Sequence, residues 1–129
     1  MPLARMALYE AGMQILCSPT WDKSADWLST MQHIAREDGV FVISNAMTLH
    51  KDDLQEYLQQ IYPEDKEWIS AGRSCIINPN GKIIAGPLDS EEGLLIAEID
   101  LEEIIAAKRK FDVVGHYARP DVFDLKIKN

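Results

Sequence analysis

The stretch DWLSTMQHIAREDGVFVISNA, residues 26–46, decides the fold because it places a helix directly before a strand. Its apolar side chains recur at helical spacing and share one face: Trp27, Met31, Ile34 and Ala35. We expect Asp26 to cap this helix and Gly39 to end it. The run 40–46 is rich in β-branched residues and lacks clean alternation, which is typical of a strand with both faces covered. The stretch therefore predicts a helix–strand unit of an α/β domain.

The residues before this unit predict a second copy of the same pattern. Apolar residues recur at helical spacing over 1–12, and Gly12 is a natural stop. MQILCSP, at 13–19, then predicts a buried strand closed by Pro19. The expected order up to residue 46 is helix, strand, helix, strand.

The residues after this unit predict a hairpin and further elements. In SCIINPNGKIIAGP, at 74–87, Asn80-Gly81 stands between two apolar runs, which is the pattern of a β-hairpin. Asp100 and Glu103 form a D-x-x-E capping box for a helix from Leu101 to about Lys110. The other expected elements are a short helix at 54–61, a strand at 93–99 and a last strand at 123–127.

Size and charge exclude several classes of function. The chain has 129 residues, enough for one domain over 1–129, and a net charge of −8 that disfavours nucleic-acid binding. Apolar runs are no longer than a strand and no signal peptide is evident, so we expect no membrane partner. The two cysteines are isolated in sequence, which agrees with a cytoplasmic location.

The expected elements leave one face of the sheet without a cover. The helices are too few for both faces of a mixed sheet, so we expect them on one face. The strands at 40–46 and 93–99 are nevertheless apolar on both sides. A monomer rarely exposes so much apolar surface, so we expect a homodimer or a higher homo-oligomer to cover it.

Residue types alone give no catalytic constellation. His33, His50 and His116 share no metal-type spacing with the cysteines, and no phosphate-binding glycine loop is present. We therefore expect no metal and no cofactor. Cys17 and Cys75 fall inside apolar strands, where we expect them to be buried and structural.

Several motifs in order resemble the nitrilase branch of the carbon–nitrogen hydrolase family. They are MPLAR (1–5), CSPTWD (17–22), W-x-x-x-M-x-H-I-A-x-E-x-G-x-F-V-I-S (27–44), G-x-S-x-I-I-x-P-x-G-x-I-x-A-G-P (72–87) and FDVVGHYARPDVF (111–123). The resemblance covers nearly the whole chain. It implies one half of a four-layer α-β-β-α sandwich, that is, a single partial domain without its N-terminal half.

The resemblance also implies which catalytic groups to look for. Family members use a glutamate base, a lysine and a cysteine nucleophile in a Cys-Trp-Glu-Asn segment that ends just before the Met-Pro-Leu-Ala-Arg motif. We therefore expect no catalytic residue in this chain, and no activity from it alone. It would retain part of the mouth of the family's active site, and the expected substrate-binding residues are Pro19, Thr20, Asn45, Ala46 and Met47.

Three functions remain open at this point. The chain is a non-catalytic, self-associating half-domain, or a part of an active nitrilase or amidase completed by a complementary N-terminal half. The third alternative is a module that binds a small ligand or a partner. The resemblance further implies that the helices at 1–12 and 26–38 lie on a surface used for subunit association.

Overall fold

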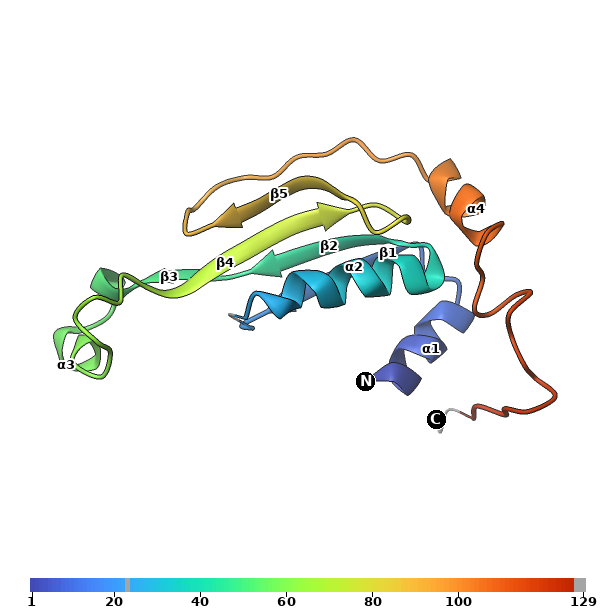
Figure 1. Cartoon of the computed structure of the whole chain (residues 1–129), viewed down its shortest axis with the longest axis horizontal. Coiled ribbons are helices and arrows are strands. Elements are labelled where there is room, and N and C mark those ends of the chain that lie inside the picture. The colour runs from blue at the N-terminus through green and yellow to red at the C-terminus, as the bar shows by residue number, and fades with distance from the viewer. Residues whose placement is uncertain (23, 127–129) are drawn as a thin grey trace.

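A computed structural model describes residues 1–22 and 24–126 and shows a mixed five-stranded sheet (Figure 1). The strands are β1 (Ile15–Thr20), β2 (Phe41–Ala46), β3 (Thr48–His50), β4 (Trp68–Ile77) and β5 (Ile83–Asp89). β1 lies parallel to β2, whereas β2, β3 and β5 each pair antiparallel with β4. The mixed α/β architecture predicted from the sequence is confirmed.

Helix α2 (Asp26–Asp38) packs along one face of this sheet and builds the core with it (Figure 1). The core cluster joins the predicted helical face to β2, the residue before it, and β4: Met31, Ile34, Ala35, Val40, Val42, Cys75 and Ile77. Gly39 ends the helix in the left-handed conformation, with a φ of 65°, as predicted. The predicted cap at Asp26 is wrong, because Ala25 already has helical dihedrals and Asp26 lies in the first turn.

Helix α1 (Pro2–Glu10) is held to α2 by a polar cluster. The Arg5 guanidinium lies 3.1 Å from a Glu37 carboxylate oxygen, and the Tyr9 hydroxyl donates to the same oxygen over 2.7 Å. Burial raises the pKa of Tyr9, and its hydrogen bond to Glu37 adds to the rise. Burial pushes the pKa of Glu37 up, but the hydrogen bonds from Tyr9 and Arg5 outweigh it and leave that pKa lowered. The helix predicted over 1–12 is thus present and ends two residues early.

The β4–β5 hairpin is present where Asn80-Gly81 predicted it. The Asn78 N–H donates to the Lys82 carbonyl over 2.9 Å, and the Gly81 N–H donates to the Asn78 carbonyl over 2.8 Å. Gly81 has a φ of 79°, a conformation that favours glycine. The turn chemistry of the sequence therefore sets the register of the two strands.

A small lobe projects from one end of the sheet (Figure 1). It holds β3, the 3₁₀ helix η1 (Lys51–Asp53) and the one-turn helix α3 (Glu56–Gln59). The short helix predicted for 54–61 is confirmed as this single turn. β3 was not predicted, because three residues are too few to show a period.

The strand predicted at 93–99 is wrong. These residues run beside β5 without strand assignment (Figure 1), and the Leu94 and Ile96 side chains are 82% and 81% exposed. A strand needs a partner for its backbone groups, and no described strand pairs with this segment. The apolar pattern is present, but the neighbour that would make it a strand is not.

Helix α4 (Glu102–Lys108) follows, but its predicted capping box does not form, because the N-cap residue is Leu101. The Asp100 carboxylate accepts from the Glu102 N–H over 2.9 Å. The Glu103 carboxylate instead accepts from the Asn78 amide over 3.0 Å, which ties α4 to the hairpin. Of the last predicted strand, 123–126 is not in a strand, and 127 lies outside the described residues.

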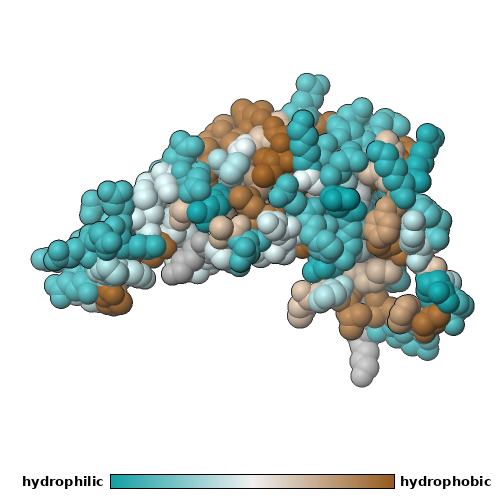
Figure 2. Space-filling view, viewed as in Figure 1, coloured by the Kyte–Doolittle hydropathy of each residue, from teal (hydrophilic) through white to brown (hydrophobic). Residues whose placement is uncertain are grey.

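The face of the sheet opposite α2 is apolar and exposed. We call it the open face and define it by Ile15, Cys17 and Ile43, of which Cys17 lies directly opposite Ile43 in the β1–β2 register. The prediction that Cys17 is buried is therefore wrong, because β1 is an edge strand whose side chains alternate between the two faces. Figure 2 shows a further hydrophobic patch where β5 and 93–99 lie. Within the described residues, no helix is long and apolar enough to cross a bilayer.

Candidate functional site

The carboxyl ends of β1 and β2 bring the five predicted binding residues together. In the parallel register Pro19 lies opposite Asn45, and Thr20 lies opposite Ala46. The Met47 N–H donates to the Thr20 carbonyl over 3.5 Å, which extends the contact past the end of β2. We call this edge the mouth. Open α/β sheets place ligands at such strand ends, and the binding role of these residues stays a prediction.

Two serines of β4 form hydrogen bonds with the backbone of the mouth. The Ser74 hydroxyl accepts from the Ala46 N–H over 3.0 Å and donates to the Ala46 carbonyl over 3.1 Å. The Ser70 hydroxyl donates to the Met47 carbonyl over 2.8 Å. Neither serine was predicted to take part. The sequence could have indicated them, because each is a serine in an otherwise apolar strand. A buried hydroxyl needs a hydrogen-bond partner.

The mouth offers binding groups and lacks acid or base groups. Asn45 and Met47 are exposed, so an amide and a thioether face the solvent there. The Trp27 indole donates to the Ser44 hydroxyl over 2.9 Å and fixes the end of β2 against α2. Thr20 accepts from the Asp22 N–H over 2.9 Å, which shapes the loop that leaves β1. This set can orient a ligand, but its one hydroxyl, that of Thr20, has no base among the five residues to activate it.

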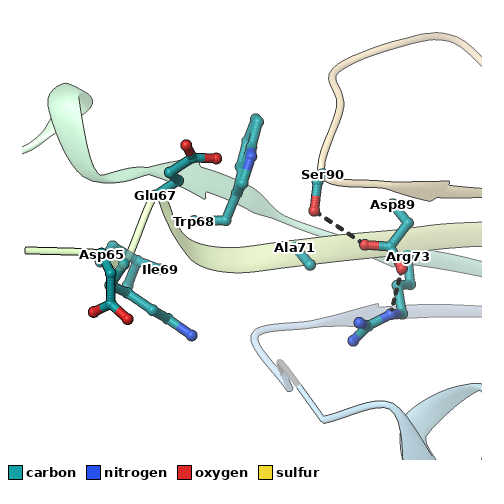
Figure 3. Close-up of a pocket in the computed structure, with 9 residues that line it drawn as sticks. Asp65, Glu67, Trp68, Ile69, Ala71, Arg73, Asp89 and Ser90 are labelled. Atoms are coloured by element: carbon teal, nitrogen blue, oxygen red, sulfur yellow. Dashed lines mark hydrogen bonds and ion pairs between the residues drawn. The ribbon is translucent and has the colours of Figure 1, made fainter. Parts of the chain in front are cut away.

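A hollow of about 490 Å³ lies farther along β4 (Figure 3). It contains an ion pair between the Arg73 guanidinium and an Asp89 carboxylate oxygen, 2.9 Å apart, and Ser90 donates to the other oxygen of Asp89. Arg73 has a φ of 78°, which is rare for a residue with a side chain and accompanies the irregular register between Gly72 and Ser74. No sequence pattern predicted this arrangement, since the strain depends on the bulge in β4.

Neither cysteine stands in a catalytic setting. Cys75 is 1% exposed in the core and burial raises the pKa of its thiol, as expected for a structural cysteine. Cys17 is exposed on the edge strand and faces Ile43 across the register. A nucleophilic cysteine needs a base or a cation beside it, and the strand neighbours of both cysteines lack one.

The three histidines lie in separate places. His33 lies 3.4 Å from Glu37 on α2, His50 contacts the Trp68 ring edge-on, and His116 contacts the Tyr117 ring. Among residues 1–22 and 24–126, no three His, Cys, Asp or Glu side chains gather closely enough to hold a metal ion.

Comparison with known proteins identifies the family to which this chain belongs. The family model described as carbon–nitrogen hydrolase matches residues 1–109, and the chain belongs to this family. Similar curated proteins include nitrilase 1 of Arabidopsis thaliana, 47% identical over 98% of the chain. An aliphatic nitrilase of Sinorhizobium fredii is 42% identical over 98% of it. A bifunctional nitrilase/nitrile hydratase of Lupinus angustifolius is 41% identical over the whole chain.

The chain spans about two fifths of the length of these relatives, between 38% and 42%. Among solved structures, a carbon–nitrogen hydrolase from Helicobacter pylori superimposes with a TM-score of 0.71 at 20% sequence identity. That alignment covers 95% of this chain and 44% of the other. This likeness shows the fold alone, and it covers less than half of the Helicobacter protein.

Proposed function

We propose that this chain is a part of a nitrilase-type hydrolase, that it supplies the mouth of the site, and that it is inactive alone. Nitrilases named among its relatives support the reaction class, hydrolysis of a non-peptide C–N bond. The resemblance assigns the catalytic glutamate, lysine and cysteine to residues outside this sequence. Cys75 cannot replace that nucleophile, because its thiol is buried in the core and its pKa is raised.

The open face is the single observation that carries the proposal. Ile15, Cys17 and Ile43 would be inward-facing if a second sheet stacked on this one, and stacked sheets pack about 10 Å apart with interleaved side chains. Apolar side chains left in water lose the free energy that burial would provide. A second layer over this face would restore it. In the absence of another chain, we propose that a second copy supplies that layer.

A complementary chain is the second candidate for the covering layer, and it would also restore catalysis. The matched relatives are more than twice as long as the matched region, so residues beyond it are available to form the other sheet. In this case Pro19, Thr20, Asn45, Ala46 and Met47 would line the mouth beside a cysteine from the other chain. The orientation of the substrate would then depend on Asn45 and Met47, the exposed polar and apolar groups of the mouth.

The test is a hydrolysis assay with and without the complementary part. The chain is incubated with an aliphatic and an aromatic nitrile, and ammonia release is measured alone and after co-refolding with the unmatched region of nitrilase 1. We expect no release from the chain alone and release from the mixture. Activity of the chain alone that survives Cys17→Ala and Cys75→Ala would contradict the proposal. A mixture without activity would reject the complementary-chain candidate.

A further inference from the structure

A second hollow lies away from the mouth, between α2, the β4–β5 turn and the end of α4. Its volume is about 840 Å³, within the range of about 300–1,000 Å³ that is usual for small-ligand sites. We call it the basic groove. The side chains used below are His33 and Arg36 of α2, Pro79 of the turn, and Lys110, Phe111 and Val113 after α4.

The first two walls of the basic groove are fixed to each other. The Gln32 amide donates to the Gly81 carbonyl over 2.9 Å, which holds the turn against α2. Gly81 is needed at this point, because an added Cβ would lie 2.6 Å from the Arg36 Cγ and 2.7 Å from its Cδ. The aliphatic part of Arg36 therefore lies on the turn, and its position is set by the glycine.

The third wall, formed by α4 and the residues after it, is fixed to α2 by a buried ion pair. The Lys108 ammonium lies 3.0 Å from a carboxylate oxygen of Asp38, whose side chain is fully buried. Close by, a Cβ added at Gly39 would lie 3.1 Å from the Ala107 Cβ, so α4 approaches the end of α2 closely. Both other walls of the groove are therefore tied to α2.

The groove has positive charges that the described chain does not neutralise. Arg36 and Lys110 make no ion pair within residues 1–22 and 24–126. Glu37 also lines the groove, but its carboxylate is already engaged by Arg5, Tyr9 and His33. The whole chain carries a net charge of −8, so a local excess of cations around a hollow stands out from its surroundings.

We propose that the basic groove binds a small organic carboxylate with an apolar body. The planar Arg36 guanidinium matches a carboxylate through two parallel N–H bonds, and Lys110 adds a second positive charge from another wall. Phe111, Val113 and Pro79 provide apolar contacts for the remainder of the ligand. This function is separate from hydrolysis and does not depend on the mouth or on a covering layer.

The experiment is a calorimetric titration of the whole chain with phenylacetate. Acetate, which has the charge without the ring, and 2-phenylethanol, which has the ring without the charge, are titrated in parallel. We expect phenylacetate to bind more tightly than either, and its affinity to fall as salt is added. Absence of phenylacetate binding at millimolar concentration, or equal affinity for the three compounds, would overturn the proposal.

Variants locate the binding in the groove. Arg36→Gln should weaken phenylacetate binding by about tenfold or more, the usual effect of losing a charged hydrogen bond. Arg109→Gln is the matched control, because Arg109 is exposed directly after α4 and does not line the groove, so the affinity of this variant for phenylacetate should be unchanged. Lys110→Gln, at an exposed position, tests the opposite wall if Arg36→Gln alters the fold. Equal affinities for Arg36→Gln, Lys110→Gln and Arg109→Gln would place the binding elsewhere and overturn the proposal.

Discussion

The two faces of the sheet are similar in sequence and different in structure. The face under α2 buries Val40, Val42 and Ile77 completely, whereas Ile15 and Ile43 on the open face are each 38% exposed. Both sets are β-branched apolar residues on neighbouring strands, apart from Val40, which directly precedes β2. The difference lies only in whether another element lies over them. An apolar pattern therefore indicates a surface that requires a cover, and it does not say which part of the molecule, or which other chain, provides it.

Truncation of core and exposed side chains should show the largest difference. Met31→Ala, in the core under α2, should lower the free energy of unfolding by about 2–5 kcal/mol, because it leaves a cavity. Ile96→Ala, outside the core, should change it by less than about 0.5 kcal/mol, because the side chain is in water. Urea unfolding followed by tryptophan fluorescence at nanomolar concentration measures both. Equal losses for the two variants would mean that 93–99 is already covered in the monomer.

Charge on the open face should prevent association without unfolding the chain. Ile43→Lys should shift the dimer dissociation constant upward by about a hundredfold or more, since burying an isoleucine is worth about 1.5–3 kcal/mol and a two-fold interface counts it twice. Ile61→Lys, at a 69% exposed site in the small lobe, is the matched control and should have no effect. Sedimentation velocity measures the assembly. A folded Ile43→Lys chain that stays dimeric would rule out sheet stacking.

The contact between α2 and the end of β2 should contribute less than the core. Trp27→Phe keeps an aromatic ring but removes the hydrogen bond to Ser44, whose side chain is buried. We expect a loss of about 1–3 kcal/mol in thermal or urea unfolding, because the Ser44 hydroxyl is left without its donor. Trp21→Phe, at a 48% exposed position, is the control and should cause no loss. Equal stability of Trp27→Phe and the wild type would show that the bond is not formed in solution.

The smallest effects concern two adjacent carboxylates at the end of α2. Burial raises the pKa of Asp38, and Lys108 only partly opposes this. Its folded pKa lies above the unfolded one, so its contribution favours folding at low pH and is lost as the pH rises through the folded pKa. Glu37 has a lowered pKa, so its contribution is present above the unfolded pKa and is lost as the pH falls.

Unfolding curves from pH 3 to pH 7 test these opposite signs. Relative to the wild type, Asp38→Asn should gain stability as the pH rises, and Glu37→Gln should lose it. The two residues are neighbours on one helix, so each serves as the control for the other. The same slope for both variants would contradict the assignment.

The sequence predicted the elements that depend on local chemistry. The helix at 26–38, its end at Gly39, and the hairpin at Asn80-Gly81 all follow from short-range spacing and turn residues, and all are present. The elements that depend on distant partners were predicted less well. The segment 93–99 has the pattern of a strand but no neighbour, and Cys17 is exposed because β1 lies at an edge.

The candidate sites also divide into features that were expected and features that depend on contacts between distant residues. The parallel register of β1 and β2 brings Pro19 beside Asn45, two of the residues that the family resemblance implied for the mouth. The serines behind the mouth, the strained Arg73 and the basic groove were not predicted, because each joins residues far apart in the chain. Arg36 and Lys110, for example, come together only because the turn and α4 are both fixed to α2.

Sedimentation equilibrium of the unmodified chain tests the central claim most directly. The claim is that the open face cannot remain in water at ordinary concentration. The account predicts a mass of at least twice the 14.6 kDa of one chain at micromolar concentration. A folded species that stays at the mass of a single chain throughout that range would contradict it.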